Sequence, residues 1–81
     1  DTKTPLNKAY NKVYKTISYD NSLQRALEKS QIEWVKLRNE QCSLEAEIYG
    51  RQADQYLIEQ TCLNYLNKQR TLYLNSVETA N

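Results

Sequence analysis

The fold is decided by residues 34–70, WVKLRNEQCSLEAEIYGRQADQYLIEQTCLNYLNKQR, in which two cysteines flank the only glycine of the chain. Apolar side chains recur at helical spacing before and after Gly50, so the stretch predicts two antiparallel helices joined by a short turn. At about 1.5 Å rise per residue, Cys42 and Cys62 lie at similar distances from that turn. Two cysteines on facing helices can form a disulfide only at the same level of the hairpin, because their Cα atoms must come within ~7 Å. The spacing therefore predicts a helical hairpin that a disulfide joins.

The two cysteines are an even number in a chain of 81 residues that has no histidine. A domain of this size is close to the limit at which a hydrophobic core alone gives enough stability, which favours a covalent crosslink. Zinc needs four ligands, so a metal site would require a second chain. The remaining alternative is a pair of buried free thiols in a cytosolic protein. We prefer the disulfide, which indicates a periplasmic or secreted protein.

Two further stretches extend the hairpin to three helices. We expect a first helix over about residues 6–18, a second over 23–49 and a third over 53–77, in a single domain spanning 1–81. One glycine and one proline leave few helix breakers, so the fold class we predict is an all-α, antiparallel three-helix bundle. Gly50 suits the left-handed conformation that ends many helices. The second helix carries two apolar seams, which predicts that it is the central element with a neighbour on each side.

Apolar positions define the expected core. The first helix has an apolar face made of Leu6, Ala9, Tyr10, Val13, Tyr14 and Ile17. The main seam of the second helix consists of Leu23, Leu27, Ser30, Trp34, Leu37, Gln41, Leu44 and Ile48. The stripe of the third helix consists of Ile58, Cys62, Tyr65, Leu66, Gln69, Leu72, Tyr73 and Val77. We expect Trp34 to be a core residue, whereas Tyr19, Tyr49 and Tyr56 lie near turns and remain free for contacts.

Nothing in the sequence has the spacing of a catalytic, cofactor or metal site. There is no histidine to act as a general base, and one glycine cannot build a phosphate-binding loop. The formal charge of +1 gives no general attraction to nucleic acid. No apolar run reaches membrane-spanning length, so we expect no transmembrane segment. We therefore expect a non-enzymatic protein, without cofactor or metal, whose partner is another protein and not nucleic acid.

A set of residues spread over most of the chain carries a family resemblance. Its members are Leu27, Ser30, Gln31, Trp34, Leu37, Arg38, Cys42, Gly50, Cys62, Gln69, Arg70, Thr71 and Leu74. With this pattern the chain resembles the LprI-type lysozyme-inhibitor N-terminal domain from about residue 6 to residue 74. The most specific part is Trp-x-x-Leu-Arg-x-x-x-Cys at 34–42, together with the second cysteine at 62.

The resemblance implies an exported bacterial envelope protein with a bridge between Cys42 and Cys62, and it offers lysozyme inhibition as a function. It supplies no catalytic motif. Many relatives carry additional cysteines toward the N terminus, where this chain has lysine and tyrosine instead. Arg38 and Arg70 match the motif, and we expect both to be structural and to pair with glutamate or with backbone carbonyls at helix ends.

The charge is unevenly distributed, and residues 42–60 carry a net −3. Lysozymes of the common animal type are cationic, so an acidic patch near the turn would speed their encounter with an inhibitor. The candidate partner-binding residues are Glu45, Glu47, Tyr49, Arg51, Asp54 and Tyr56. We expect a binding protein of the bacterial envelope that acts on lysozyme or another cell-wall hydrolase, with the oligomeric state left open. The alternatives are a structural or assembly module of an envelope complex and an immunity protein against a delivered toxin.

Overall fold

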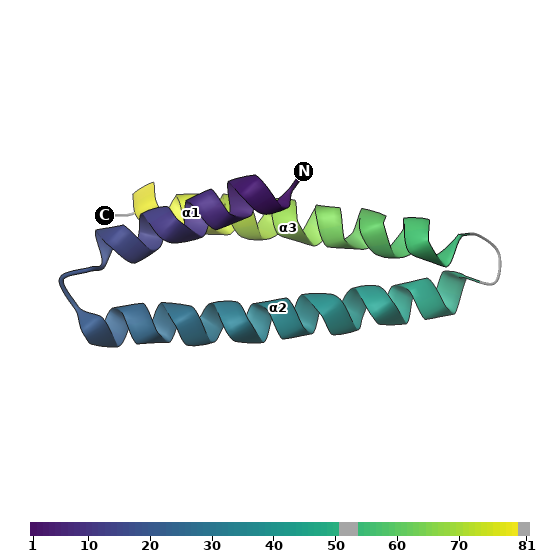
Figure 1. Cartoon of the computed structure of the whole chain (residues 1–81), viewed down its shortest axis with the longest axis horizontal. Helices are drawn as coiled ribbons and strands as arrows, with labels where there is room; N and C mark the ends of the chain where they lie inside the picture. Colours follow the sequence, from purple (N-terminus) through teal and green to yellow (C-terminus); the bar gives the residue numbers. More distant parts are fainter. Residues whose placement is uncertain (51–53, 80–81) are drawn as a thin grey trace.

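Three helices make up the part of the protein that the structure describes. The structure, a computed structural model, describes residues 1–50 and 54–79, except for the side chains of residues 78 and 79. The helices are α1 (Lys3–Thr16), α2 (Asn21–Tyr49) and α3 (Gln55–Thr79). Each runs antiparallel to the one before it, in an elongated molecule of 50 × 20 × 17 Å (Figure 1). The predicted all-α, antiparallel three-helix bundle is confirmed.

Aspartate side chains mark where α2 and α3 begin. The Asp20 carboxylate accepts hydrogen bonds from the backbone N–H groups of the second and third residues of α2, at 2.9 and 3.2 Å. Asp54 accepts the corresponding bond from the second residue of α3, at 2.9 Å. These N–H groups have no acceptor inside the helix, so each cap satisfies donors that would otherwise be unpaired. The N-cap of α2 is therefore Asp20.

The helix ends differ from the expected ones by two or three residues. α1 begins at Lys3 and ends at Thr16, whereas the expected span was 6–18. Pro5 therefore lies in the first turn, where its missing N–H removes no hydrogen bond. α2 begins two residues before the expected start and ends at Tyr49 as expected, and α3 runs from 55 to 79 and not from 53 to 77.

Gly50 ends α2, but not in the left-handed conformation that we predicted. Its φ of −68° and ψ of −11° lie in the right-handed region, so that prediction is wrong. The reason for glycine here is space. A Cβ would overlap the backbone carbonyl oxygen of Ala46 and the side chain of Gln55, whose Nε2 would be 2.7 Å away.

α3, and not α2, is the helix that packs against both others. Its C-terminal half lies beside α1 and its length lies along α2, whereas α1 and α2 approach each other at few positions (Figure 1). The prediction of a central second helix is therefore wrong. α1 has 14 residues and α3 has 25, or roughly 21 Å against 37 Å of helix. The end of the hairpin near Gly50 thus projects beyond α1.

The apolar core lies where α1 covers α3. Leu6, Ala9 and Val13 of α1 are buried together with Leu74 of α3. The side chains packed against this cluster are Tyr10, Leu27, Trp34 and Val77, which confirms the expected core position of Trp34. Burying such side chains contributes about 1.5–3 kcal/mol each.

Several members of the predicted stripes are exposed, contrary to expectation. These residues are Leu23, Ser30, Leu37, Gln41, Leu44, Ile48, Tyr65, Gln69, Leu72 and Tyr73. Helical spacing shows which residues share a face, but not whether another helix covers that face. The three tyrosines expected to be free of the core, Tyr19, Tyr49 and Tyr56, are exposed as predicted.

The predicted disulfide is confirmed and joins α2 to α3. Cys42 and Cys62 are bonded, with their Cα atoms 5.4 Å apart, and both residues are buried. Among the described residues of the hairpin that lie beyond α1, the buried ones are Cys42, Ala46 and Cys62. In the chain-entropy model a crosslink over a loop of this length contributes about 3 kcal/mol. We call residues 41–50 and 54–66, most of which lie beyond α1, the hairpin arm.

Candidate functional site

Three motif residues form a stack near the middle of the molecule. The guanidinium carbons of Arg38 and Arg70 lie 5.3 and 5.5 Å from the centre of the Trp34 ring. That of Arg70 also lies 5.2 Å from the centre of the Tyr73 ring. Burial lowers the pKa of both arginines, and for Arg70 the interaction with Tyr73 partly opposes this shift. Both guanidinium groups stay charged at physiological pH, so both make cation–π contacts with the indole.

Arg38 begins a chain of hydrogen bonds that links the three helices. Its Nη1 donates to Oδ1 of the buried Asn67 at 2.9 Å. The Asn67 amide donates to the Thr2 hydroxyl at 3.0 Å, and that hydroxyl donates to Oδ1 of Asn64 at 2.8 Å. Buried polar groups need such partners, so this network fixes the position of α1 on α3 relative to α2.

Arg70 joins α3 to the first half of α2. Its Nε donates to Oε1 of Gln31 at 3.0 Å and its Nη2 donates to Oγ of Ser30 at 3.0 Å. We expected Arg38 and Arg70 to pair with glutamate or backbone carbonyls, and this is wrong. Their acceptors are side-chain amides and a hydroxyl, and both arginines hold α2 and α3 together.

The predicted partner-binding residues lie on two separate hollows of the hairpin arm. Glu45 and Tyr49 line a groove between α2 and α3, whereas Glu47 and Tyr56 line a different, smaller hollow. Asp54 caps α3, and Arg51 lies outside the residues that the structure describes. Closeness to the turn in sequence therefore does not bring the five described residues to one site.

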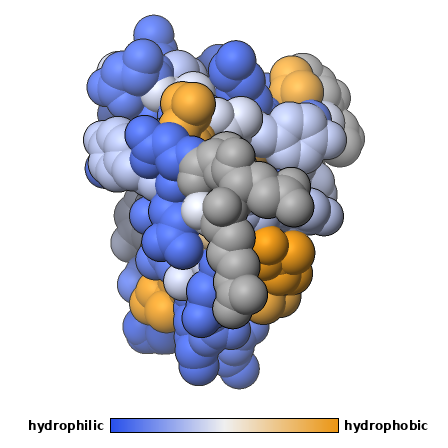
Figure 2. All heavy atoms as spheres, turned by 90° about the vertical axis from the view of Figure 1, so that its right-hand side faces the viewer, coloured by the Kyte–Doolittle hydropathy of each residue, from blue (hydrophilic) through white to orange (hydrophobic). Residues whose placement is uncertain are grey.

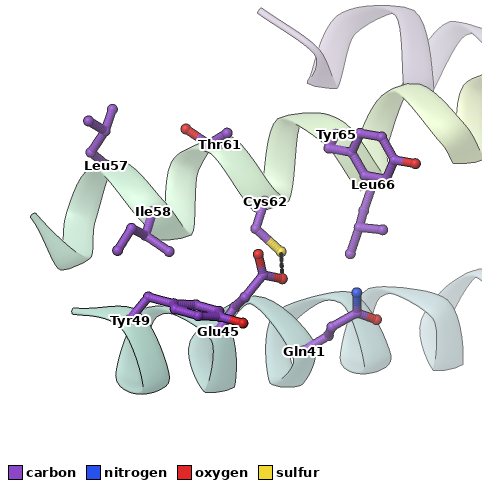
Figure 3. A pocket seen from close by; sticks show the side chains of 9 residues that line it. All are labelled: Gln41, Glu45, Tyr49, Leu57, Ile58, Thr61, Cys62, Tyr65 and Leu66. Atoms are coloured by element: carbon purple, nitrogen blue, oxygen red, sulfur yellow. Dashed lines mark hydrogen bonds between the residues drawn. The ribbon is translucent and has the colours of Figure 1, made fainter. Parts of the chain in front are cut away.

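The larger groove has a volume of about 600 Å³. Its lining consists of Gln41, Glu45 and Tyr49 from α2 and Leu57, Ile58, Thr61, Cys62, Tyr65 and Leu66 from α3 (Figure 3). The sequence did not predict the α3 side of this groove, because Tyr65 was expected to lie in the core. Leu57, Thr61 and Tyr65 recur every four residues, so the sequence does contain a second stripe beside the buried one.

A carboxylate lies against the disulfide inside this groove. Oε2 of Glu45 is 3.4 Å from Sγ of Cys62 (Figure 3). The sulfur is bonded to Cys42 and has no proton to donate, so this is a van der Waals contact and not a hydrogen bond. Within the described residues no group donates a hydrogen bond to the Glu45 carboxylate.

An exposed apolar stripe borders the groove along α2. Leu37, Leu44 and Ile48 are each exposed over more than half of their surface. Gln41, which belongs to the same stripe by its spacing, also lines the groove, so the two surfaces are continuous. The view from the turn end shows hydrophobic side chains at the surface among hydrophilic ones (Figure 2). Apolar surface of this extent is typical of a contact site.

The described part of the chain has neither a cluster of metal ligands nor a membrane-spanning helix. Residues 1–50 and 54–79 contain no group of three or more histidine, cysteine, aspartate or glutamate side chains placed to hold a metal ion. No helix in these segments is long and apolar enough to cross a membrane. The features that these residues do present are apolar contact surface and carboxylates.

The fold and the site define a small, disulfide-bonded helical protein that presents exposed apolar side chains and carboxylates. Comparison with known families shows a match to the family described as lysozyme inhibitor LprI over residues 2–74. The chain belongs to this family, so the resemblance carried by the Trp34–Cys42 motif and by Cys62 is confirmed. Neither the curated proteins nor the solved structures with which the chain was compared include a significant match. The family is one of lysozyme inhibitors, and its proteins are exported.

Proposed function

We propose that this protein is a non-enzymatic binding protein of the bacterial envelope that inhibits lysozyme or another cell-wall hydrolase. Family membership supports this class of target. The disulfide supports a periplasmic or secreted location, because such bonds persist in oxidising compartments. The observation that carries the proposal is the hairpin arm, which projects beyond α1 and combines exposed apolar and acidic side chains (Figure 1).

The arm has the composition of a protein-binding surface. Tyr49, Tyr56 and Leu57 are exposed by 57, 70 and 62%. Exposed tyrosines provide large contact areas with few rotatable bonds, and they are enriched at binding hot spots. The disulfide and the Asp54 cap restrain the arm before any partner arrives. Such preorganisation reduces the entropy lost on binding.

Negative charge is concentrated near the turn of the hairpin and positive charge elsewhere, which favours contact of a cationic partner with the arm. Residues 42–60 carry a net −3, and the remaining residues carry +4. A cationic enzyme is attracted by the acidic end and repelled by the rest of the molecule. We infer that a lysozyme of the animal type meets the arm first.

Charge reversal on the arm tests the proposal. We expect the oxidised protein to slow lysis of bacterial cell walls by an animal lysozyme in a turbidity assay. The double variant Glu45→Lys/Glu47→Lys should inhibit at least about tenfold less, because it places positive charge on the contact surface. The matched control is Glu28→Lys/Glu33→Lys, which makes the same charge change at exposed positions in the first half of α2. This control should inhibit as the wild type does.

Two results would contradict the proposal. Unchanged lysis at a large molar excess of wild-type protein would show that lysozyme of this type is not the target. Equal loss of inhibition in both double variants would show that net charge matters and the arm does not.

A second candidate function is a structural or assembly module of an envelope complex. The observation in its favour is the exposed stripe of Leu37, Leu44 and Ile48, which no helix covers. Sedimentation velocity over a wide concentration range tests self-assembly. A mass that stays that of the monomer at every concentration would contradict it.

A further inference from the structure

We propose that the groove beside the disulfide accepts a cationic amphipathic helix on the surface of the partner protein, with Glu45 as the ionic contact. This inference rests on the proposed function as a protein-binding inhibitor. Beyond that function, the inference specifies which face of the arm binds and what kind of segment of the partner is bound.

The arm is a two-helix segment of a three-helix protein. Near the C-terminal end of α3, α1 supplies the third helix, but beyond the N terminus of α1 only α2 and α3 continue (Figure 1). The groove follows the line between these two helices on the arm. A helix laid along it would pack against both, as amphipathic helices do in hydrophobic grooves.

The size and lining of the groove suit the apolar face of a helix. Tyr49, Leu57 and Tyr65 are exposed by 57, 62 and 61%, and Ile58 and Leu66 are half-buried between them (Figure 3). On α3 the lining extends from Leu57 to Leu66, or roughly 13 Å of helix. Apolar residues at positions i, i+4 and i+7 of a docked helix span a similar length, about 10 Å.

Glu45 determines the charge of the segment that can dock. Its carboxylate faces the groove without a hydrogen-bond donor from the described residues, and its near neighbour is the Cys62 sulfur. Covering this carboxylate with an apolar or acidic helix would remove it from water without a partner, which is costly. A lysine or arginine from the docked helix would pair with it.

The other hollow of the arm fits such a helix less well. It has a volume of about 320 Å³ and is lined by Ser43, Ala46, Glu47, Gln55, Tyr56 and Glu59. Apart from Ala46 and Tyr56 this lining is polar, so it lacks the row of apolar side chains that the groove provides. It therefore supplies a control position, Glu47, two residues from Glu45 on the same helix.

Synthetic helices test the proposal on the oxidised protein. The probes are a 14-residue leucine/lysine peptide with leucine at positions i, i+3, i+4 and i+7, and its leucine/glutamate counterpart. Isothermal titration calorimetry should show binding of the lysine peptide and at least about tenfold weaker binding of the glutamate peptide, equivalent to ~1.4 kcal/mol. Amide NMR shifts on adding the lysine peptide should be largest over 41–49 and 57–66.

Two variants with opposite expectations accompany the peptides. Glu45→Gln should weaken binding of the lysine peptide about tenfold, because a neutral amide cannot form the charged pair. Glu47→Gln removes the same charge from the other hollow and should change the affinity less than about twofold. Equal affinity for the two peptides, equal effects of the two variants, or NMR shifts confined to α1 would overturn the proposal. A concentration-dependent dimer that shifts the groove resonances without peptide would also overturn it, because a second copy would then occupy the groove.

The peptide and lysozyme experiments separate the two proposals. Peptide binding without inhibition of lysozyme would contradict the proposed target and leave the groove as a binding site. Inhibition of lysozyme without peptide binding would contradict the groove and leave the proposed function.

Discussion

At the scale of the residue, Trp34 contacts two guanidinium groups, one from its own helix and one from α3. The sequence indicated that Trp34, Arg38 and Arg70 are members of the family motif, but not that they contact one another. It did not indicate the acceptors of the two arginines. Gln31, Ser30 and Asn67 are ordinary polar residues with no spacing that predicts pairing across helices, so only the three-dimensional arrangement shows them.

Replacing Arg70 by lysine tests the contribution of this stack to stability. Arg70→Lys keeps the positive charge, but it loses the planar group over Trp34 and the fork that bonds Gln31 and Ser30. We expect the free energy of unfolding to fall by about 1–2 kcal/mol in urea titrations. Lys68→Arg, at an exposed position on the same helix, should leave it unchanged. Identical unfolding of the two variants would show that the stack contributes nothing.

At the scale of the element, the three helices were predictable, but their neighbours were not. Periodic apolar residues and the scarcity of helix breakers indicated where helices form. The same periodicity placed Leu37, Leu44 and Ile48 of α2 in a seam, and the structure leaves them exposed. α1 packs against α3 and approaches α2 at few positions, so none of the described helices covers this seam of α2. The spacing of apolar residues along one helix does not show whether a neighbouring helix covers them.

Through Tyr10, the docking of α1 makes the folded state less stable at alkaline pH. Burial raises the pKa of Tyr10 above its ordinary value of 10.0, and the nearby Glu28 carboxylate adds to the shift. The folded state therefore holds the phenol proton more tightly than the unfolded chain. This contribution is complete below pH 10 and is lost as the pH rises through the folded-state pKa.

Removing the phenol group tests this linkage. Tyr10→Phe should show a smaller loss of unfolding free energy between pH 8 and pH 11 than the wild type, measured by urea denaturation at each pH. Tyr19→Phe, at an exposed position, should follow the wild type. A pH dependence that is the same in all three proteins would contradict the assignment to Tyr10.

At the scale of the whole molecule, the two ends of the bundle are stabilised differently. The end that contains α1 has the apolar core and the Arg38–Asn67–Thr2 network. The arm has few buried side chains, and the Cys42–Cys62 bond joins its two helices. Counting residues from Gly50 predicted that both cysteines lie at one height, as a disulfide requires, and the even cysteine count in a small chain favoured the bond over free thiols. The division of the arm into a groove and a smaller hollow depends on side-chain directions, and so it was not predictable.

Hydrogen exchange of the oxidised protein, alone and saturated with an animal lysozyme, tests most directly whether the arm is the binding end. We predict slower exchange of backbone amides in residues 41–50 and 54–66, with α1 residues 6–13 unchanged, because contact with a partner suppresses local opening of the covered segment. Slower exchange confined to α1 and the C-terminal half of α3, or no change at saturating enzyme, would contradict the account.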